Sequence, residues 1–246
     1  MSLSLPEGDG PLLRERLRTA RLYFCCGARP GGADPEALLR SALGGGVDIL
    51  QIREKELGRA EIERSAGTFR RVCDTFSALF IVNDDPDLAR ACDADGVHLG
   101  QDDGSVEEAR ALLGPDAIIG LSTHSKEQVD ATAELPVDYI SVGPIWETPT
   151  KAGRPAVGLE LVEHAAAHAQ RPFFAIGGID AGNAEQVVRA GARRLCAVRA
   201  IRDAADPGAA AGELRRAFVA TEGAEPSTQD VLLDQPAPWR GVAPGG

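Results

Sequence analysis

Short apolar runs typical of β-strands alternate with helical patterns along most of this chain. There are eight such runs, and a helical segment follows each of them. Strict alternation favours a parallel sheet with crossover helices, because each connection then packs back onto the sheet. Eight units in about 200 residues predict an α/β fold, a single closed (β/α)8 TIM barrel. An open doubly wound sheet is the alternative, but residues 27–32, after the first strand, do not fit its G-x-G-x-x-G phosphate loop.

The expected strands are short, and some of the helices carry start signals. The strands are predicted at Leu22–Cys25, Val47–Gln51, Leu79–Val82, Gly96–Leu99, Ala117–Gly120, Tyr139–Val142, Phe173–Ile176 and Leu195–Val198. The helices are predicted at Pro35–Leu43, Glu61–Phe76, Pro86–Cys92, Ser105–Leu113, Lys126–Glu134, Glu160–Ala169, Ala184–Ala190 and Ala209–Ala220. Asp34 and Asp85 are expected to be the N-caps of the first and third helices, and Pro86 suits a first helical position.

One domain is expected, with an extension at each end. A leader or a short helix is predicted for residues 1–19, and the barrel is predicted for residues 20–220. Residues 221–246 predict a disordered tail, because prolines, glycines and acidic residues occur there without a period. The net charge of −11 argues against binding to nucleic acid or to an anionic membrane. A phosphate ligand must therefore be held by local groups or through a metal ion.

Cysteine usage and the N-terminal residues favour a cytoplasmic protein. The five cysteines have no zinc-site or redox-pair spacing. Buried, reduced thiols are expected, and these suit a reducing compartment. The chain does not begin with the pattern of a signal peptide. No apolar run approaches the about 18 residues that a membrane span needs, so no membrane contact is expected.

The segment Gly143–Pro155 carries an unusual concentration of hydrogen-bond donors. It follows the apolar run Tyr139–Val142, and the Gly-Pro pair prevents that strand from continuing. Two threonines, Lys151 and Arg154 then supply two hydroxyls, an ammonium and a guanidinium. These groups suit oxygen-rich anions, above all phosphate. A solvated loop of chance polarity is the alternative for this segment taken alone.

Polar residues follow almost every predicted strand, where the reactive groups of a (β/α)8 barrel lie. They are Gln51–Lys55, Asn83–Asp84, His98–Asp103, Ser122–His124, Gly177–Ile179 and Val198–Arg199. Their convergence on one rim favours a ligand site over solvation. For His98 and His124, a structural histidine bonded to the backbone is favoured over a general base. His164 and His168 are four residues apart on an outer helix without a third ligand, so a metal site there is not favoured.

Four of these segments suggest particular ligands. Arg53 and Lys55 alternate with their neighbours, so an extended backbone would point both cations at one polyanion. Asp84 and Asp103 end successive units and could share one Mg²⁺, which takes one or two carboxylates beside phosphate oxygens and water. A helix N-cap is the alternative for either aspartate alone. The Gly177–Gly178 pair allows the backbone to approach a phosphate closely.

With these motifs the chain resembles the thiamine-phosphate synthase family, from about Arg21 to Arg202. Gln51–Lys55 matches the family's Q-[LI]-R-E-K, Asn83–Asp84 its N-D, Gly96–Asp103 its G-V-H-L-G-Q-[DE]-D, Gly120–Ser122 its G-x-S, Gly143–Lys151 its G-P-x-x-x-T-x-T-K, and Ala175–Ile179 its A-I-G-G-I. The resemblance implies a transferase of thiamine biosynthesis. Such enzymes join a pyrimidine carried as its methyl diphosphate to a thiazole phosphate, and release pyrophosphate.

The resemblance also implies roles for individual residues. The catalytic residues would be Arg53, Lys55 and Lys151, and the Mg²⁺ ligands would be Asp84 and Asp103. The pyrimidine diphosphate would be bound by Gln51, Ile52, Arg53, Glu54, Lys55, Asn83, Ser122 and Lys151. The thiazole phosphate would be bound by Thr148, Pro149, Thr150, Gly177, Gly178, Val198 and Arg199. The family also implies small phosphorylated substrates, a cytoplasmic location and self-association.

One departure from the family concerns the thiazole side. The family commonly has Val-Ser after the eighth strand, whereas this chain has Val198-Arg199. The guanidinium could bind the phosphate, or turn away and leave that contact to the backbone. Two other functions stay open, a related thiazole tautomerase and a non-catalytic barrel that binds thiazole or thiamine phosphate. The tautomerase should not need the complete diphosphate and metal set, and magnesium-dependent release of pyrophosphate would separate both alternatives from a synthase.

Overall fold

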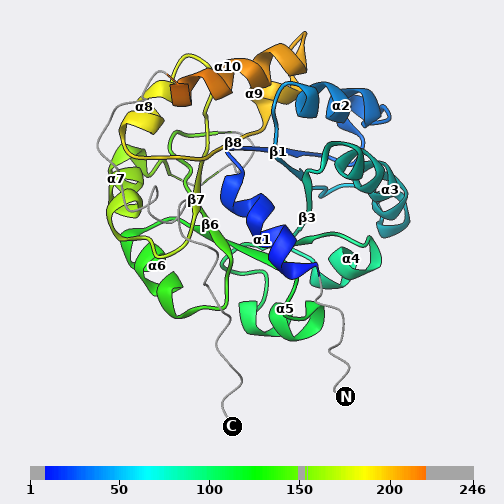
Figure 1. Ribbon diagram of the computed structural model, residues 1–246, viewed down its shortest axis with the longest axis horizontal. Coiled ribbons are helices and arrows are strands. Elements are labelled where there is room, and N and C mark those ends of the chain that lie inside the picture. Colours follow the sequence, from blue (N-terminus) through cyan, green and yellow to red (C-terminus); the bar gives the residue numbers. More distant parts are fainter. Residues whose placement is uncertain (1–8, 149–152, 154, 220–246) are drawn as a thin grey trace, which may run out of the picture.

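The computed structural model describes residues 9–148, 153 and 155–219. Eight parallel strands close into a barrel in sequence order, so the predicted (β/α)8 fold is confirmed (Figure 1). The strands are β1 (Leu22–Cys26), β2 (Ile49–Ile52), β3 (Leu79–Asn83), β4 (Gly96–Leu99), β5 (Ile118–Thr123), β6 (Tyr139–Val142), β7 (Phe173–Ile176) and β8 (Leu195–Ala197). The last strand pairs with the first through Leu22 and Leu195, which closes the sheet.

Helices surround the barrel and alternate with its strands, except for α1, which precedes the first strand (Figure 1). They are α1 (Gly10–Thr19), α2 (Glu36–Gly44), α3 (Arg59–Phe76), α4 (Pro86–Ala91), α5 (Val106–Leu113), α6 (Lys126–Ala131), α7 (Gly158–His168), α8 (Ala184–Arg189), α9 (Arg199–Arg202) and α10 (Pro207–Val219), with short 3-10 turns η1 (Pro30–Gly32) and η2 (Thr132–Glu134). Each predicted helix is present within a few residues. The expected tail, residues 221–246, lies outside the described residues.

Several predicted boundaries are wrong by a few residues. β5 continues to Thr123, three residues beyond its predicted end, because both faces of a barrel strand are covered and its polar end is also buried. The helix α9 is not predicted, since four residues are too few to show a helical period. Asp85 caps α4 as expected, accepting from the Leu88 amide at 2.8 Å. Asp34 is not the N-cap of α2; that residue is Pro35, and Asp34 accepts from the Glu36 amide.

Apolar side chains form two layers, one on each face of the closed sheet. The larger layer lies between strands and helices and includes Phe69, Phe80 and Val162. The smaller layer fills the barrel interior and includes Tyr23, Tyr139 and others on alternate strand positions. Alternation arises because successive strand side chains point to opposite faces. None of the helices in the described part of the chain is long and apolar enough to cross a membrane.

Aspartates tie the strands together where they begin. An aspartate directly precedes β2, β4 and β6, and each accepts an amide from the start of the preceding strand: Asp48 from Leu22 at 2.9 Å, Asp95 from Phe80 at 2.7 Å and Asp138 from Ile119 at 2.8 Å. An arginine pairs with each carboxylate, Arg215, Arg70 and Arg110 respectively. These contacts fix the relative heights of neighbouring strands.

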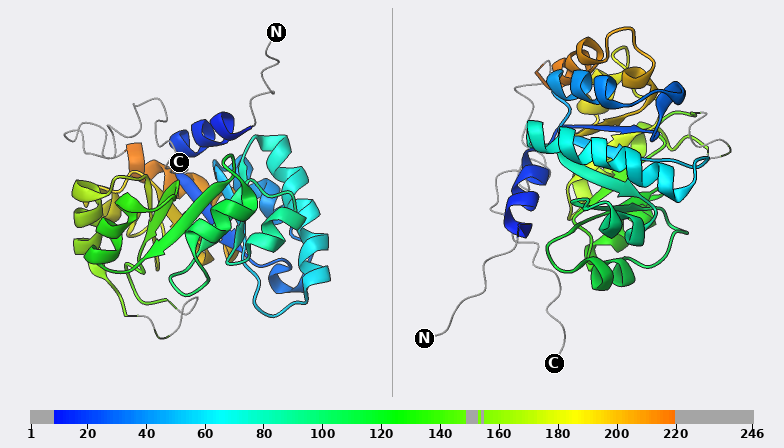
Figure 2. Two further views of the ribbon diagram at one scale, coloured as in Figure 1. Left: turned by 90° about the horizontal axis from the view of Figure 1, so that it is seen from below. Right: turned by 90° about the vertical axis from the view of Figure 1, so that its right-hand side faces the viewer.

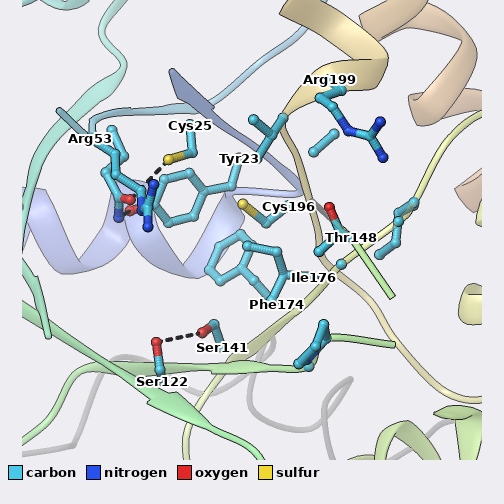
Figure 3. A pocket seen from close by; sticks show the side chains of 18 of the residues that line it. Tyr23, Cys25, Arg53, Ser122, Ser141, Thr148, Phe174, Ile176, Cys196 and Arg199 are labelled. Atoms are coloured by element: carbon cyan, nitrogen blue, oxygen red, sulfur yellow. Dashed lines mark hydrogen bonds between the residues drawn. The ribbon is translucent and has the colours of Figure 1, made fainter. Parts of the chain in front are cut away.

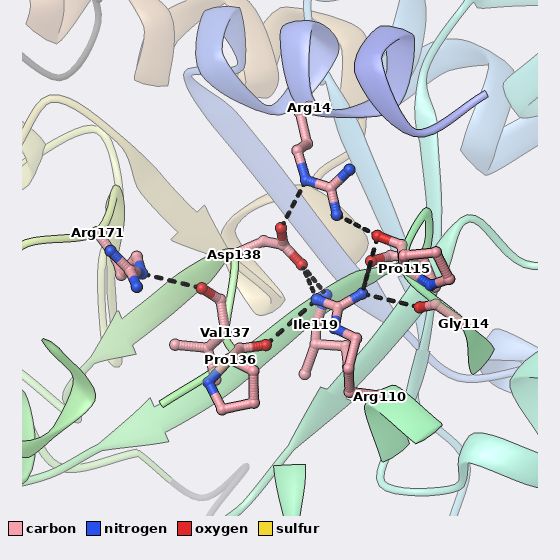
Figure 4. A network of polar contacts seen from close by, with 10 residues as sticks. Arg14, Arg110, Gly114, Pro115, Ile119, Pro136, Val137, Asp138 and Arg171 are labelled. Atoms are coloured by element: carbon pink, nitrogen blue, oxygen red, sulfur yellow. Dashed lines mark hydrogen bonds and ion pairs between the residues drawn. The ribbon is translucent and has the colours of Figure 1, made fainter. Parts of the chain in front are cut away.

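Helix α1 lies across one end of the barrel, at the beginnings of the strands (Figure 2). Its Leu17 is fully buried and belongs to the interior layer. Arg14 reaches Asp138 at 3.0 Å (Figure 4). The Arg194 guanidinium donates to the Arg18 carbonyl at 3.2 Å. The helix therefore closes this end and leaves the carboxyl ends of the strands as the open end.

Candidate active site

A cavity of about 310 Å³ opens where the strands end. Its lining draws on most of the barrel strands and the loops that follow them, as expected for the ligand site of this fold. Figure 3 shows Arg53 and Arg199 on opposite sides of the cavity, with Phe174 between them. The cavity therefore presents a cation on each of two opposite walls and an aromatic ring in its floor.

The structure brings most of the predicted site residues into this cavity. Those in its lining are Gln51, Arg53, Asn83, Ser122, Thr148, Gly177, Gly178, Val198 and Arg199. Gln51 lies within β2, which agrees with the predicted strand Val47–Gln51. Asn83 and Ser122 were expected to follow strands but lie within β3 and β5. They therefore project from the rigid barrel wall rather than from mobile loops.

Some predicted residues lie elsewhere. Ile52 is buried in the layer between strands and helices. Lys55, Asp84 and Asp103 lie on the rim, outside the cavity lining. Pro149, Thr150 and Lys151 fall outside the described residues.

Glu54 organises the loop after β2. Its carboxylate accepts the amides of Ala28 at 3.1 Å and of Lys55 and Glu56 at 2.9 Å each. Burial raises the pKa of Glu54, but the backbone donors of Glu56, Ala28, Lys55 and Leu57 outweigh it and hold the pKa below its usual value. These contacts fix the backbone on either side of Arg53 and Lys55.

The rim beside Arg53 carries both of the proposed metal ligands. Lys55 forms an ion pair with Asp84. The Asp84 amide donates to the His98 carbonyl at 2.8 Å, and Asp103 accepts from the Gly100 amide at 2.9 Å. Both residues thus lie beside the end of β4. Asp84 also has a φ of 63°, an uncommon backbone for a residue other than glycine and one that recurs at functional sites.

This donor set suits Mg²⁺ better than a transition metal. Within the described part of the chain, no three His, Cys, Asp or Glu side chains gather as a ready-made metal site. Mg²⁺ typically takes one or two carboxylates and completes its shell with phosphate oxygens and water. Asp84 and Asp103 beside a cationic cavity fit that requirement, provided that the ligand brings phosphate.

Two glycines shape the opposite wall. Gly177 and Gly178 have φ angles of 107° and 68°. A Cβ on Gly178 would lie 2.9 Å from the Cβ of Trp146, and one on Gly177 would collide with Pro144. Only glycine combines this backbone with such close packing. Thr148 and Arg199 line the same wall, so a hydroxyl, a guanidinium and open backbone meet there.

Sequence reasoning missed several residues of the cavity floor. Five of the residues that line it lie within strands rather than after them, and these are Tyr23, Cys25, Ser141, Phe174 and Cys196. The signal that identifies them is the period of two along each strand, which places alternate residues inside the barrel.

The two rim histidines have different environments. His124 contacts the Gly143 carbonyl through Nδ1, as a backbone-bonded histidine should. His98 contacts side-chain hydroxyls, those of Tyr139 and Ser122 at 3.0 Å each and that of Ser141 at 3.4 Å. Outside the cavity, His164 pairs with Asp130 at 2.7 Å.

Fold and cavity together define a (β/α)8-barrel protein with a polar ligand site at the carboxyl ends of its strands. The family model for thiamine monophosphate synthase matches residues 22–201. A thiamine-phosphate synthase of Thermobifida fusca (strain YX) is 50% identical over 214 residues, 86% of this chain and 98% of that protein. One of Acidothermus cellulolyticus is 51% identical over 203 residues, 82% of this chain and 96% of its own length.

Solved structures agree with these relatives. Thiamine phosphate pyrophosphorylase from Pyrococcus furiosus has a TM-score of 0.75 and 32% identity, covering 86% of this chain and all of its own. A 3-hexulose-6-phosphate synthase has a TM-score of 0.58 at 21% identity, and that likeness shows the fold alone. The chain therefore belongs to the thiamine monophosphate synthase family, and it is an enzyme, a transferase of thiamine biosynthesis.

Proposed function

We propose that this enzyme condenses 4-amino-5-hydroxymethyl-2-methylpyrimidine diphosphate with 4-methyl-5-(2-phosphoethyl)thiazole, or its carboxylated form, to give thiamine phosphate and pyrophosphate. One observation carries the proposal. A single cavity joins Gln51, Arg53, Asn83 and Ser122 on one side to Thr148, Gly177, Gly178 and Arg199 on the other. Two phosphorylated substrates need a site with a separate anion-binding group at each end.

The chemistry asks the protein mainly to bind and to stabilise charge. The bond between the pyrimidine methylene carbon and the diphosphate oxygen breaks, and its electron pair leaves with pyrophosphate. The aminopyrimidine can delocalise the resulting positive charge, which favours a dissociative path. The thiazole nitrogen then donates its lone pair to that carbon and forms the new bond. No side chain has to act as a nucleophile.

The residues divide this work by position. Arg53 can hold the diphosphate at the cavity wall, and Lys55, with Lys151, can complete its charge environment. Gln51, Asn83 and Ser122 can orient the pyrimidine from the barrel wall, while Glu54 keeps the cationic loop in place. Such preorganised donors are worth most against the charge that develops on the leaving group.

Asp84 and Asp103 would hold Mg²⁺ against the diphosphate. When bound, the ion neutralises charge on the leaving pyrophosphate. In the structure Asp84 pairs with Lys55. Binding of metal and diphosphate would exchange that pairing, so that Lys55 turns to the phosphate and Asp84 to the metal.

The thiazole phosphate would lie at the loops after β7 and β8, where barrels of this type commonly bind phosphate. Gly177 and Gly178 allow close approach of the backbone, Thr148 adds a hydroxyl, and Val198 and Arg199 close the wall. Pro149 and Thr150 belong to the same proposed site. A cytoplasmic location fits the five free thiols, and self-association stays a prediction.

The test is to incubate the purified protein with both substrates and Mg²⁺, and to measure thiamine phosphate and pyrophosphate with and without EDTA. Both products should form and EDTA should abolish them. Tight binding of thiazole phosphate without any product would instead support the tautomerase or the non-catalytic barrel.

A further inference from the structure

A chain of polar side chains crosses the barrel interior beneath the cavity. Gln51 on β2 donates to the Tyr23 hydroxyl at 2.7 Å, and that hydroxyl lies 3.0 Å from the Tyr139 hydroxyl. Tyr139 lies 3.0 Å from Nδ1 of His98, whose Nε2 lies 3.0 Å from the Ser122 hydroxyl. We call these five residues the interior relay. It connects Gln51 with Ser122, two of the groups proposed to orient the pyrimidine.

The relay has one direction, which the Gln51 amide sets. The Cys25 thiol donates to the Gln51 carbonyl oxygen at 3.0 Å, so the amide nitrogen faces Tyr23. An amide nitrogen only donates, so the Tyr23 oxygen accepts there, and its own proton is available for the Tyr139 oxygen 3.0 Å away. Burial raises the pKa of Tyr139, while the hydrogen bond from Tyr23 lowers it, as a donated bond should.

The same sequence of donors and acceptors determines which ring nitrogen of His98 carries the proton. Tyr139 has accepted from Tyr23, so its proton goes to Nδ1 of His98. A neutral imidazole with Nδ1 as acceptor carries its proton on Nε2. Nε2 lies 3.0 Å from the Ser122 oxygen and 3.4 Å from the Ser141 oxygen, so Ser122 is the nearer acceptor. The two serine oxygens are 3.5 Å apart (Figure 3), which is long for a hydrogen bond. Ser122 thus accepts from His98, and its own proton can point to a ligand in the cavity.

Packing holds the members of the relay in place. His98, Ser122 and Gln51 are all less than 10% exposed, and the two tyrosines are almost completely buried. The Tyr139 ring stacks on His98 with centroids 5.4 Å apart, and Phe174 meets both tyrosine rings edge-on. A Cβ on Gly120 would overlap the Tyr139 ring, so glycine on β5 makes room for it.

We infer that His98 is a positioning residue, held as its Nε2–H tautomer by the interior relay, and that it commits the Ser122 hydroxyl to donate to an acceptor atom of the substrate, such as a ring nitrogen. This inference rests on the proposed function for the identity of that substrate. The relay itself belongs to the ligand-free protein, so its direction can be tested separately.

The test is ¹⁵N NMR of the histidine side chains in the full chain at neutral pH, which reports the protonated ring nitrogen directly. The chain has four histidines. His98→Gln assigns the signal, and if that variant does not fold, Gln substitutions of the other three assign it by elimination. The wild type should show His98 as the single Nε2–H tautomer. An Nδ1–H tautomer or an imidazolium would overturn the inference.

Two matched variants test the direction of the relay. Tyr139→Phe and Tyr23→Phe each delete one buried hydroxyl, but only Tyr139 touches His98. Tyr139→Phe should give a mixture of tautomers and lower kcat/KM by about 2- to 10-fold, the loss of one hydrogen bond. Tyr23→Phe should keep a larger share of the Nε2–H form, because Tyr139 loses the bond that orients its proton but can still donate to His98.

A Tyr139→Phe protein that keeps the single Nε2–H form would overturn the inference, whatever its activity. An equal loss of that form in both variants would show general loosening of the core and would also overturn it. If the wild type makes no thiamine phosphate, the proposed function fails, while the tautomer measurements still decide the relay.

Discussion

Asp84 combines an unusual backbone with a charged partner at the rim of the cavity. Its left-handed φ of 63° turns the chain directly after β3, and its carboxylate pairs with Lys55. Asparagine tolerates the same backbone, so Asp84→Asn removes the charge and keeps the turn. The substitution therefore separates electrostatics from folding.

We expect Asp84→Asn to lower kcat by about 100-fold or more, the scale for removing one electrostatic stabiliser. The same fall is expected for Lys151→Ala. Steady-state kinetics over a range of Mg²⁺ concentrations measure the effect. Asp87→Asn, an exposed acid three residues along the chain, is the control and should behave as the wild type. Near-normal turnover in Asp84→Asn would remove the metal role.

Gly178 is the residue on which the thiazole side depends most closely. We expect Gly178→Ala to raise KM for the thiazole phosphate, because the new methyl strains the backbone and pushes against Trp146. Gly31→Ala is the matched control, since Gly31 has a similar φ of 62° but no atom within 4 Å of its Cβ position. If both variants keep a normal KM, close backbone approach is not required there.

At the scale of elements, the loop between β2 and α3 depends on one carboxylate. The folded-state pKa of Glu54 lies below its ordinary value of 4.5, so the unfolded chain binds more protons at mildly acidic pH. Its contribution to stability is therefore complete above about pH 4.5 and is lost as the pH falls through the lower, folded-state pKa.

The free energy of unfolding, measured against pH for the wild type and Glu54→Gln, checks this sign. The wild type should be the more stable at neutral pH, and the difference should shrink below pH 4.5, the ordinary pKa. A difference that stays constant down to pH 2 would mean that the carboxylate charge does not contribute. About pH 2 is the lower limit because the unfolded carboxyl is then fully protonated.

Helix α1 is attached to the barrel through Asp138, which is 2% exposed. Asp138→Ala leaves Arg14 and Arg110 without their carboxylate and the Ile119 amide without its acceptor (Figure 4). We expect a loss of about 3 kcal/mol in urea unfolding. Glu185→Ala, which breaks an exposed pair with Arg189, should cost under about 0.5 kcal/mol. Equal losses would contradict a special role for Asp138.

At the scale of the whole molecule, alternation of strands and helices was sufficient to predict the barrel. Strand ends were harder, because in a parallel barrel a polar residue such as Ser122 can still be buried inside the strand. Helix α9 has too few residues for a period. The aspartates before β2, β4 and β6 recur in the sequence, but their meaning depends on contacts between neighbouring strands.

The residues of the candidate site also differ in how clearly the sequence reveals them. Residues with charge or special backbone, such as Arg53, Asp84 and Gly178, stand out in the sequence. Tyr23 and Tyr139 look like ordinary core residues until the barrel closes and brings their hydroxyls within 3.0 Å of each other. The interior relay joins five different strands, and no local pattern carries that information.

In the proposed reaction, one cavity holds both substrates and couples loss of pyrophosphate to formation of the new carbon–nitrogen bond. The most direct measurement is a single-turnover experiment with enzyme in excess, in which pyrophosphate and thiamine phosphate are quantified over time. If the cavity couples the two steps, the two products form in equal yields, and little pyrophosphate forms when the thiazole phosphate is omitted. Rapid pyrophosphate release without matching thiamine phosphate would mean hydrolysis rather than transfer, and would contradict the account.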